Sequence, residues 1–144
     1  MSGQIAVAVP KGKDALKEKI EAKIDSNPLL KKYKNQLLLD LTSEGLRIQI
    51  VDEGNRPMFD SGSAVVKPYM RDLLRELGSV LTEVPNRLTV EGHTDAQPFP
   101  GGDKGYSNWE LSADRANASR RELVAGGLAE ARMLRVQGLA ASKL

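Results

Sequence analysis

The side chains best suited to bind a ligand gather in two stretches, Gly92-His93-Thr94-Asp95 and the segment that begins at Asn108. Leu111 and Arg115 are four residues apart in the second stretch, so on a helix they would share one face. A carboxylate and a guanidinium beside one cleft suit a zwitterion. Asp95 would accept its ammonium group, and Arg115 would hold its carboxylate through paired hydrogen bonds. On spacing alone, an ordinary surface ion pair between the two, worth about 0–1 kcal/mol, is the simpler interpretation.

His93 is the only histidine of the chain, and this weakens every catalytic interpretation. With Asp95 and Glu110 it could be arranged as a hydrolase or metal site, but catalytic zinc normally needs three protein ligands rich in histidine. No serine stands in a recognisable nucleophile turn, and the absence of cysteine excludes thiolate chemistry. We therefore expect no catalytic residue, no metal and no cofactor, and predict that His93 orders its loop through hydrogen bonds.

Basic and glycine-rich segments do not identify a nucleotide or nucleic-acid partner. Residues 101–105 precede a predicted helix, but their spacing differs from the phosphate-binding P-loop and no strand leads into them. The lysines of residues 11–34 are interleaved with acidic residues, as on a solvated helix face, and Tyr33 is the only aromatic residue there for stacking on a base. With a net charge of +2, the sequence favours no nucleic-acid partner.

Two amphipathic helices are expected to position the candidate residues. One begins at Pro68 and carries apolar residues at helical spacing: Met70, Leu73, Leu74, Leu77, Val80 and Leu81. The other begins at Ser107, which with Glu110 has the spacing of a capping box, and should end near residues 124–125, before Gly126-Gly127. One stripe of this second helix should pack on the sheet and leave Arg115 facing outward: Trp109, Ala113, Ala116, Leu123 and Val124.

Strands are predicted around these helices. Residues 46–52 alternate apolar and polar side chains, the pattern of a half-buried strand, and residues 36–41, 87–91 and 132–137 are further candidates. Residues 13–25 carry an apolar stripe at a spacing of four, which predicts a lysine-rich helix. Residues 1–12 include Gly3, Pro10 and Gly12 and show no usable periodicity.

The order of these elements predicts an α/β (α+β) sandwich, a sheet with helices packed on it. The 144 residues, 40% of them apolar, suffice for one core. We expect a disordered arm over residues 1–12, a helical linker over 13–35 and one domain over 36–144. No apolar run approaches the roughly 18 residues of a membrane span, and no signal peptide is recognisable.

Three motifs resemble the OmpA-like peptidoglycan-binding domain. The first is Gly92-His93-Thr94-Asp95. The second is Asn108-Trp109-Glu110-Leu111-Ser112-Ala113-Asp114-Arg115-Ala116 on the following predicted helix, and the third is Phe59-Asp60-Ser61-Gly62-Ser63-Ala64. The resemblance covers about residues 46–138. It implies a β-α-β-α-β mixed sheet with helices packed on one face, here preceded by an N-terminal helix.

This resemblance also implies a ligand. Proteins of the family bind the diaminopimelate-containing stem peptide of peptidoglycan without cleaving it, which favours a ligand-binding pair over a surface ion pair. Asp95 and Arg115 correspond to the family's ligand-contacting aspartate and arginine. Thr94, Asn108 and Leu111 match positions that line the same pocket.

A narrower resemblance, carried by residues 48–52, 55–59 and 105–123, is to the stator proteins of the flagellar motor. It implies a periplasmic cell-wall anchor, a homodimer, and a membrane ion-channel partner subunit reached through a segment upstream of this chain. Two other functions stay open: a peptidoglycan anchor of an outer-membrane protein or lipoprotein, and a cell-wall hydrolase that uses His93 and Asp95.

The sequence departs from the family near its C-terminal end. The family's Asn-Arg-Arg segment, which enters a final strand, has no counterpart before Leu144. A missing strand is expected to expose a sheet edge and core surface, and to weaken ligand binding relative to a complete domain.

Overall fold

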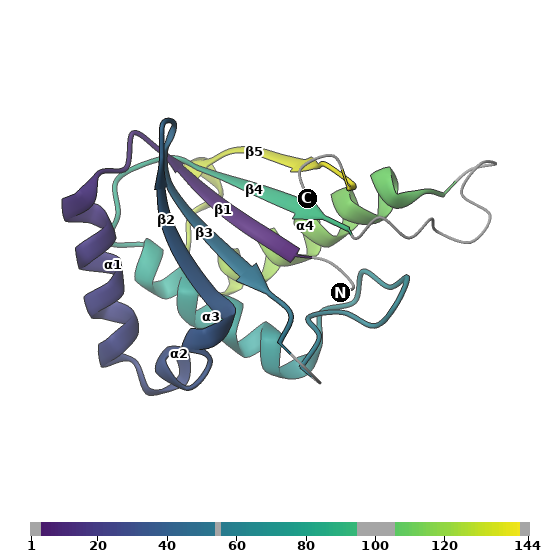
Figure 1. Cartoon of the computed structure of the whole chain (residues 1–144), viewed down its shortest axis with the longest axis horizontal. Coiled ribbons are helices and arrows are strands. Elements are labelled where there is room, and N and C mark those ends of the chain that lie inside the picture. Colours follow the sequence, from purple (N-terminus) through teal and green to yellow (C-terminus); the bar gives the residue numbers. More distant parts are fainter. Residues whose placement is uncertain (1–3, 54–55, 95–105, 142–144) are drawn as a thin grey trace.

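Five strands form one mixed sheet, with helices on one of its faces (Figure 1). The computed structural model describes residues 4–53, 56–94 and 106–141. The elements follow in the order β1 (Gln4–Pro10), α1 (Asp14–Ser26), α2 (Pro28–Lys32), η1 (Lys34–Gln36), β2 (Leu37–Thr42), β3 (Gly45–Val51), α3 (Pro68–Leu81), β4 (Leu88–His93), α4 (Asn108–Ala125), η3 (Glu130–Arg132) and β5 (Met133–Gly138). This architecture confirms the predicted fold class.

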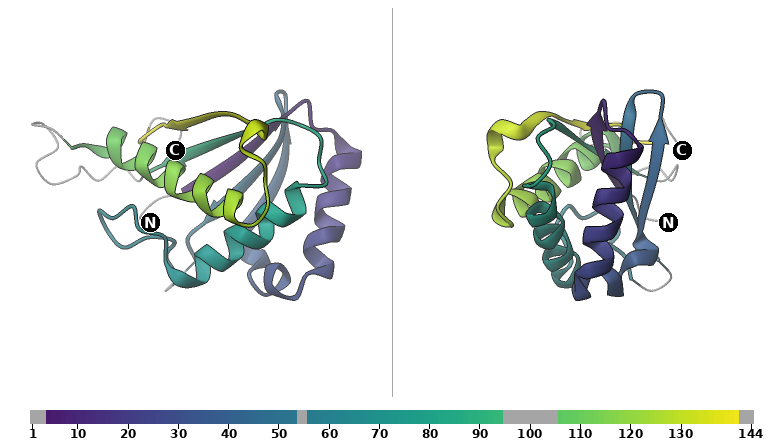
Figure 2. Two further views of the ribbon diagram at one scale, coloured as in Figure 1. Left: turned by 180° about the vertical axis from the view of Figure 1, so that it is seen from behind. Right: turned by 90° about the vertical axis from the view of Figure 1, so that its left-hand side faces the viewer.

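The core lies between the sheet and the helices α1, α3 and α4. Seen from behind, α3 and α4 lie across the sheet (Figure 2). The six apolar residues predicted for the helix at Pro68 are all buried in α3, and β3 buries Leu46, Ile48 and Ile50 as its alternation predicts. Burial of these side chains supplies most of the stabilisation, at about 25 cal/mol per Å² of apolar surface. None of the helices among the described residues is both long and apolar enough to cross a membrane.

The prediction of a disordered arm over residues 1–12 is wrong for the part that the structure describes. Gln4–Pro10 is β1, which lies at the centre of the sheet and pairs antiparallel with both β3 and β4. Ile5, Val7 and Val9 face the core and are fully buried. The strand was missed because alanines occupy its other face, so the sequence shows a short apolar run with no alternation.

Residues 13–35 form helices, but they are not a separate linker. Ile20, Ile24 and Leu30 belong to the same core as the sheet residues. Asn27 caps α2 by accepting hydrogen bonds from the Leu29 and Leu30 backbone N–H groups at 3.0 and 3.1 Å. Its amide also donates to Glu76 of α3 at 2.9 Å. The domain therefore includes both β1 and this helical segment.

The sheet is continuous without the Asn-Arg-Arg segment. Its strand order is β2-β3-β1-β4-β5, with β4 and β5 parallel and the other neighbours antiparallel. The sheet edge and core surface that a missing strand was expected to expose are not found between β3 and β4, because β1 pairs with both strands. The face opposite the helices carries no helix among the described residues.

Candidate functional site

The predicted site residues converge where β4 ends and α4 begins. Thr94 follows the last residue of β4 and is 2% exposed, and its backbone N–H donates to the Ala140 carbonyl at 2.9 Å. The Ala140 N–H in turn donates to the Ser112 hydroxyl of α4 at 3.0 Å. These bonds join the ends of β4 and β5 to the start of α4. Asp95 lies outside the described residues.

Glycines allow this close approach of helix and sheet. A Cβ atom added to Gly92 of β4 would lie 1.9 Å from the Ser112 carbonyl oxygen, and one added to Gly138 of β5 would lie 2.3 Å from the Ala113 nitrogen. Both obstacles are backbone atoms of α4. Only glycine at these two positions lets the strand ends lie directly against the helix that carries the site.

The start of α4 is fixed by the predicted cap. The Ser107 side chain accepts a hydrogen bond from the Trp109 N–H at 3.2 Å, and its hydroxyl donates to Glu110 at 2.5 Å. This cap places Asn108 in the first turn and Leu111 and Arg115 on one buried face of the helix. Trp109 was expected to pack on the sheet, but its side chain is 56% exposed.

The prediction that Arg115 faces outward is wrong. Arg115 is 1% exposed, and its Nε and Nη2 donate to the carbonyl oxygens of Ser63 and Asp60 at 2.8 and 3.1 Å. Its guanidinium also lies 4.8 Å from the centre of the Phe59 ring, within range of a cation–π contact. The side chain turned inward because these neighbours replace the water that a buried cation loses.

The loop of residues 59–66, named the 59–66 loop below, is therefore part of the site. A β-bridge between Phe59 and Val66 closes it, and Lys67 forms an ion pair with Asp60 at 2.5 Å. The spacing of the residues alone predicts no role for this loop, although its Phe59–Ala64 motif carries part of the family resemblance. The structure joins this loop to Arg115, and it joins Thr94 to α4 through Ala140 and Ser112.

The Thr94 hydroxyl is a second notable feature of this region. Its Oγ1 atom is buried and has no hydrogen-bond partner among the described residues. Leaving a buried hydroxyl unsatisfied costs about 1–3 kcal/mol. Such an atom can bind a polar group of a ligand.

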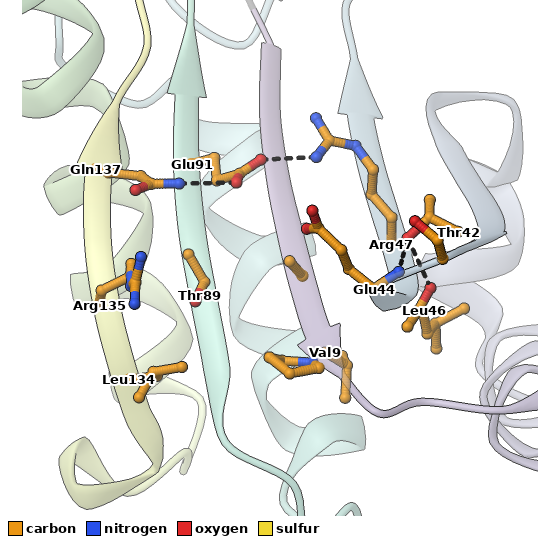
Figure 3. A pocket seen from close by; sticks show the side chains of 14 residues that line it. Val9, Thr42, Glu44, Leu46, Arg47, Thr89, Glu91, Leu134, Arg135 and Gln137 are labelled. Atoms are coloured by element: carbon orange, nitrogen blue, oxygen red, sulfur yellow. Dashed lines mark hydrogen bonds and ion pairs between the residues drawn. The ribbon is translucent and has the colours of Figure 1, made fainter.

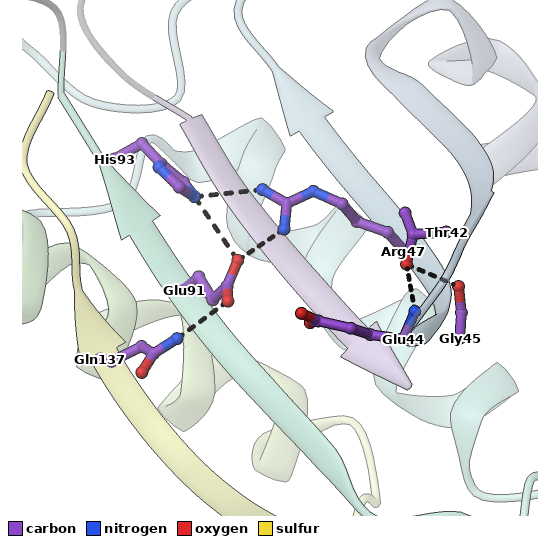
Figure 4. A network of polar contacts seen from close by, with 7 residues as sticks. All are labelled: Thr42, Glu44, Gly45, Arg47, Glu91, His93 and Gln137. Carbon is purple, nitrogen blue, oxygen red and sulfur yellow. Dashed lines mark hydrogen bonds and ion pairs between the residues drawn. The ribbon is translucent and has the colours of Figure 1, made fainter. Parts of the chain in front are cut away.

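A separate polar cluster lies on the open face of the sheet (Figure 4). The Glu91 carboxylate accepts hydrogen bonds from Arg47 at 2.7 Å and from Gln137 at 2.8 Å. His93 Nε2 lies 3.3 Å from Arg47 Nη2 and 3.6 Å from Glu91 Oε1. His93 Nε2 can accept a hydrogen bond from Arg47 or donate one to Glu91, depending on the tautomer of the ring. His93 thus takes part in hydrogen bonding, as predicted, but within strand β4 and not in a loop.

A hollow of about 420 Å³ adjoins this cluster (Figure 3). Its walls include Arg47 of β3, Glu91 of β4, and Arg135 and Gln137 of β5. The Glu91 carboxylate and the Gln137 amide are already bonded to neighbours, so these groups hold strands together. No group of three metal-ligating side chains occurs in the described part of the chain.

The Glu91 carboxylate should make the fold sensitive to acid. Hydrogen bonding to His93, with smaller contributions from Arg47 and Gln137, lowers its pKa from 4.5 to about 2 despite its burial. Between about pH 2 and pH 4.5, Glu91 binds more protons in the unfolded chain than in the folded chain. The stabilisation is complete above about pH 5 and is lost as the pH falls through 4.5 toward 2, by up to about 3 kcal/mol.

Urea unfolding at pH 7 and pH 3 measures this loss. The Glu91→Gln variant should show little of this loss of stability between pH 7 and pH 3. The control Glu83→Gln removes an exposed glutamate paired with Lys23 and should still show the loss. An equal loss of stability in acid for the wild type and Glu91→Gln would contradict the assignment.

Comparisons with known proteins identify the family of this chain. Residues 58–144 match the OmpA family. Motility protein B of Escherichia coli (strain K12) is 57% identical over 127 residues, which cover 88% of this chain and 41% of that protein. Motility protein B of Bacillus subtilis (strain 168) is 34% identical over 100 residues, or 69% of this chain and 37% of that protein. The chain thus spans about two fifths of the length of these relatives.

Among solved structures, a MotB-like protein from Desulfovibrio vulgaris has the same fold. The two superpose with a TM-score of 0.63, covering 88% of this chain and 80% of the other at 20% sequence identity. The matched family region contains α3, β4, α4 and β5, and therefore Thr94, Leu111 and Arg115. On this evidence the chain belongs to the OmpA family.

Proposed function

We propose that this chain binds peptidoglycan, at the point where the end of β4, the first turns of α4 and the 59–66 loop meet. The observation that carries the proposal is the buried Thr94 hydroxyl, which has no hydrogen-bond partner among the described residues and directly follows β4, the strand that packs against the helix of Arg115. The OmpA family is non-catalytic, so the chain is a binding domain and not an enzyme.

The ligand is a stem peptide of the diaminopimelate type, which carries an ammonium group and a carboxylate on one side chain. Arg115 binds the carboxylate with the same guanidinium group that donates to the Ser63 and Asp60 carbonyls. Asp95 accepts the ammonium group, and the Thr94 hydroxyl and Asn108 amide bond polar atoms of the same ligand. Leu111, 4% exposed, forms the apolar wall against its hydrocarbon.

The whole protein is a stator anchor of the flagellar motor. The relatives named Motility protein B support this assignment, although the chain spans only 41% of the Escherichia coli protein. In this proposal the domain lies in the periplasm, forms a homodimer, and is tethered by an upstream segment to a membrane ion-channel partner subunit.

Co-sedimentation with purified sacculi tests the site. Asp95→Asn should reduce the affinity by about 30-fold or more, because loss of one charge leaves the ligand ammonium unpaired, at about 2–5 kcal/mol. The matched control is Asp103→Asn, which removes an acidic charge from the same polar segment and should sediment as the wild type does. Undiminished sedimentation of Asp95→Asn would refute the site.

Competition tests the ligand class separately. Soluble muropeptides that contain diaminopimelate should release the wild-type chain from sacculi. Muropeptides with lysine in its place lack the second carboxylate and should compete at least tenfold less well, since a charge-assisted pair contributes about 1.5–3 kcal/mol. Equal competition by both would remove the role of Arg115 in carboxylate recognition while leaving general peptidoglycan binding intact.

A further inference from the structure

The chain that leads into the 59–66 loop is fixed by side chains that lie outside the candidate site. The Arg56 carbonyl accepts a hydrogen bond from the Tyr69 hydroxyl at 2.6 Å and a second from the Gln36 amide at 3.3 Å. Two residues further on, the Met58 N–H donates to the Asp52 carboxylate at 2.9 Å. Side chains from other parts of the fold therefore determine the path by which the chain enters this loop.

Gln36 is buried at the centre of these contacts. It is 0% exposed, and its Nε2 atom lies 3.0 Å from the Val51 carbonyl, 3.3 Å from the Arg56 carbonyl and 3.1 Å from the Tyr69 hydroxyl. Its Oε1 atom is buried and has no partner among the described residues, which costs free energy. An apolar side chain of similar size would avoid this cost, so the amide is explained by the groups that its nitrogen binds.

Tyr69 lies in the first turn of α3, and an aromatic neighbour orients its ring. The centre of the ring is 5.2 Å from that of Tyr33, at an interplanar angle of 44°, within the range of favourable aromatic contacts. Tyr33 follows α2, which lies beside α3 (Figure 1). Burial raises the pKa of the Tyr69 hydroxyl above its usual value. The hydroxyl therefore keeps the proton that it donates to the Arg56 carbonyl at neutral pH.

The segment that these residues fix continues directly into the groups that contact Arg115. Phe59 follows Met58, is 1% exposed, and carries the ring whose centre lies 4.8 Å from the Arg115 guanidinium. The next residue is Asp60, whose carbonyl accepts a hydrogen bond from Arg115 Nη2 at 3.1 Å. Because both residues lie within two positions of Met58, a displacement of residues 56–58 would move both of these contacts.

We propose that Tyr69 and Gln36 are positioning residues for Arg115. They fix residues 56–58 through the Arg56 carbonyl, and this segment places the ring and the carbonyl that hold the guanidinium. Asp52 acts in the same way through the Met58 N–H. Binding groups need such support, since a displacement of about 1 Å is enough to weaken a preorganised site. The consequence for peptidoglycan binding rests on the proposed function, whereas the placement of Arg115 does not.

The NMR signal of the Arg115 side chain measures its placement without any ligand. Its Nε–H donates to the Ser63 carbonyl at 2.8 Å, and the chemical shift of this proton depends on that bond. Tyr69→Phe keeps the ring and removes only the hydroxyl, so we expect the Arg115 Nε–H signal to move. The matched control is Tyr33→Phe, because the Tyr33 hydroxyl forms no hydrogen bond in the described part of the chain. The control should leave the signal in place, and an unmoved signal in Tyr69→Phe would overturn the proposal.

Asp52 provides a second pair of variants with the same readout. Asp52→Ala removes the acceptor of the Met58 N–H, so the Arg115 Nε–H signal should move here too. Asp52→Asn keeps a side-chain oxygen that can accept the same hydrogen bond, and should return the signal to its wild-type position. If both variants moved the signal equally, or if neither did, the bond between Asp52 and Met58 would not position the loop.

A double-mutant cycle tests the consequence for binding, with purified sacculi as the probe. Tyr69→Phe should lower the affinity about fivefold or more, the factor expected for one hydrogen bond. In the Arg115→Lys background the same change should lower it less than about twofold, because the group that Tyr69 positions is no longer present. An equal loss in both backgrounds would show that Tyr69 acts independently of Arg115, against the proposal. If the wild-type chain did not bind sacculi, the proposed function would fail, and the Arg115 signal would still decide the positioning.

Discussion

The Gly92→Ala variant should lose about 3 kcal/mol or more of its free energy of unfolding and should no longer bind sacculi. The added Cβ atom would lie 1.9 Å from the Ser112 carbonyl oxygen and 3.2 Å from the Ala116 nitrogen. Both are backbone atoms of α4, so no side-chain rotation relieves the overlap. Overpacking of this kind typically costs about 1–3 kcal/mol, and more where backbone must move.

The effect on binding follows from the elements that Gly92 holds together. Thr94 is two residues further along the chain, directly after β4, and Arg115 is one turn beyond Ser112 on α4. If α4 moves away from β4 to accept the methyl group, the Thr94 hydroxyl and the Arg115 guanidinium move apart. Errors of about 1 Å are enough to disrupt a site that relies on preorganised groups.

Gly127→Ala is the matched control. Gly127 has a φ of 118°, but the nearest atom to an added Cβ is Thr82 Cγ2 at 3.6 Å, an ordinary contact. This variant should lose about 1–2 kcal/mol through backbone strain alone and keep its affinity for sacculi. Urea unfolding and co-sedimentation measure the two effects. Wild-type stability in Gly92→Ala would show that the helix and strand tolerate a wider separation.

Periodic elements were predictable from the sequence because one physical cause dominates each of them. The α3 stripe and the alternation of β3 arise from burying a single face, and the α4 cap arises from the local chemistry of Ser107 and Glu110. The motif containing Thr94, Asn108, Leu111 and Arg115 also led to the correct family. Local sequence therefore determined most element boundaries to within one or two residues.

The two wrong predictions, for β1 and for Arg115, have a different cause. In both cases the residues that determine the structure lie far away in the sequence. β1 shows no alternation because both of its faces are apolar, and only pairing with β3 and β4 makes it a strand. Arg115 was expected to face solvent because its helical neighbours gave no reason for burial. Its partners, the Asp60 and Ser63 carbonyls, are 55 and 52 residues away. Helical periodicity cannot detect such partners.

The Arg115→Ala variant should be destabilised by about 3–4 kcal/mol. Truncation removes two part-buried hydrogen bonds from a charged group to the Asp60 and Ser63 carbonyls, at about 1.5–3 kcal/mol each, and the contact with Phe59. The cavity left by a side chain that is 1% exposed adds to this loss. The free energy of unfolding in urea measures the effect.

Arg120→Ala is the control on the same helix. Arg120 forms an ion pair with Glu130, whose side chain is 62% exposed, so its removal should cost less than about 1 kcal/mol. If Arg115→Ala were no less stable than Arg120→Ala, the contacts of Arg115 with the 59–66 loop would contribute nothing measurable to the fold.

Arg115→Lys separates the structural role of this residue from its proposed role in recognition. A lysine keeps the positive charge but cannot bond two carbonyls and a carboxylate with one planar group, so it should recover part of the stability. If Arg115 binds the ligand carboxylate, the folded lysine variant should still lose tenfold or more in affinity for sacculi. If its affinity instead equals that of the wild type, Arg115 only supports the 59–66 loop. Recognition would then rest with Asp95, Thr94 and their neighbours.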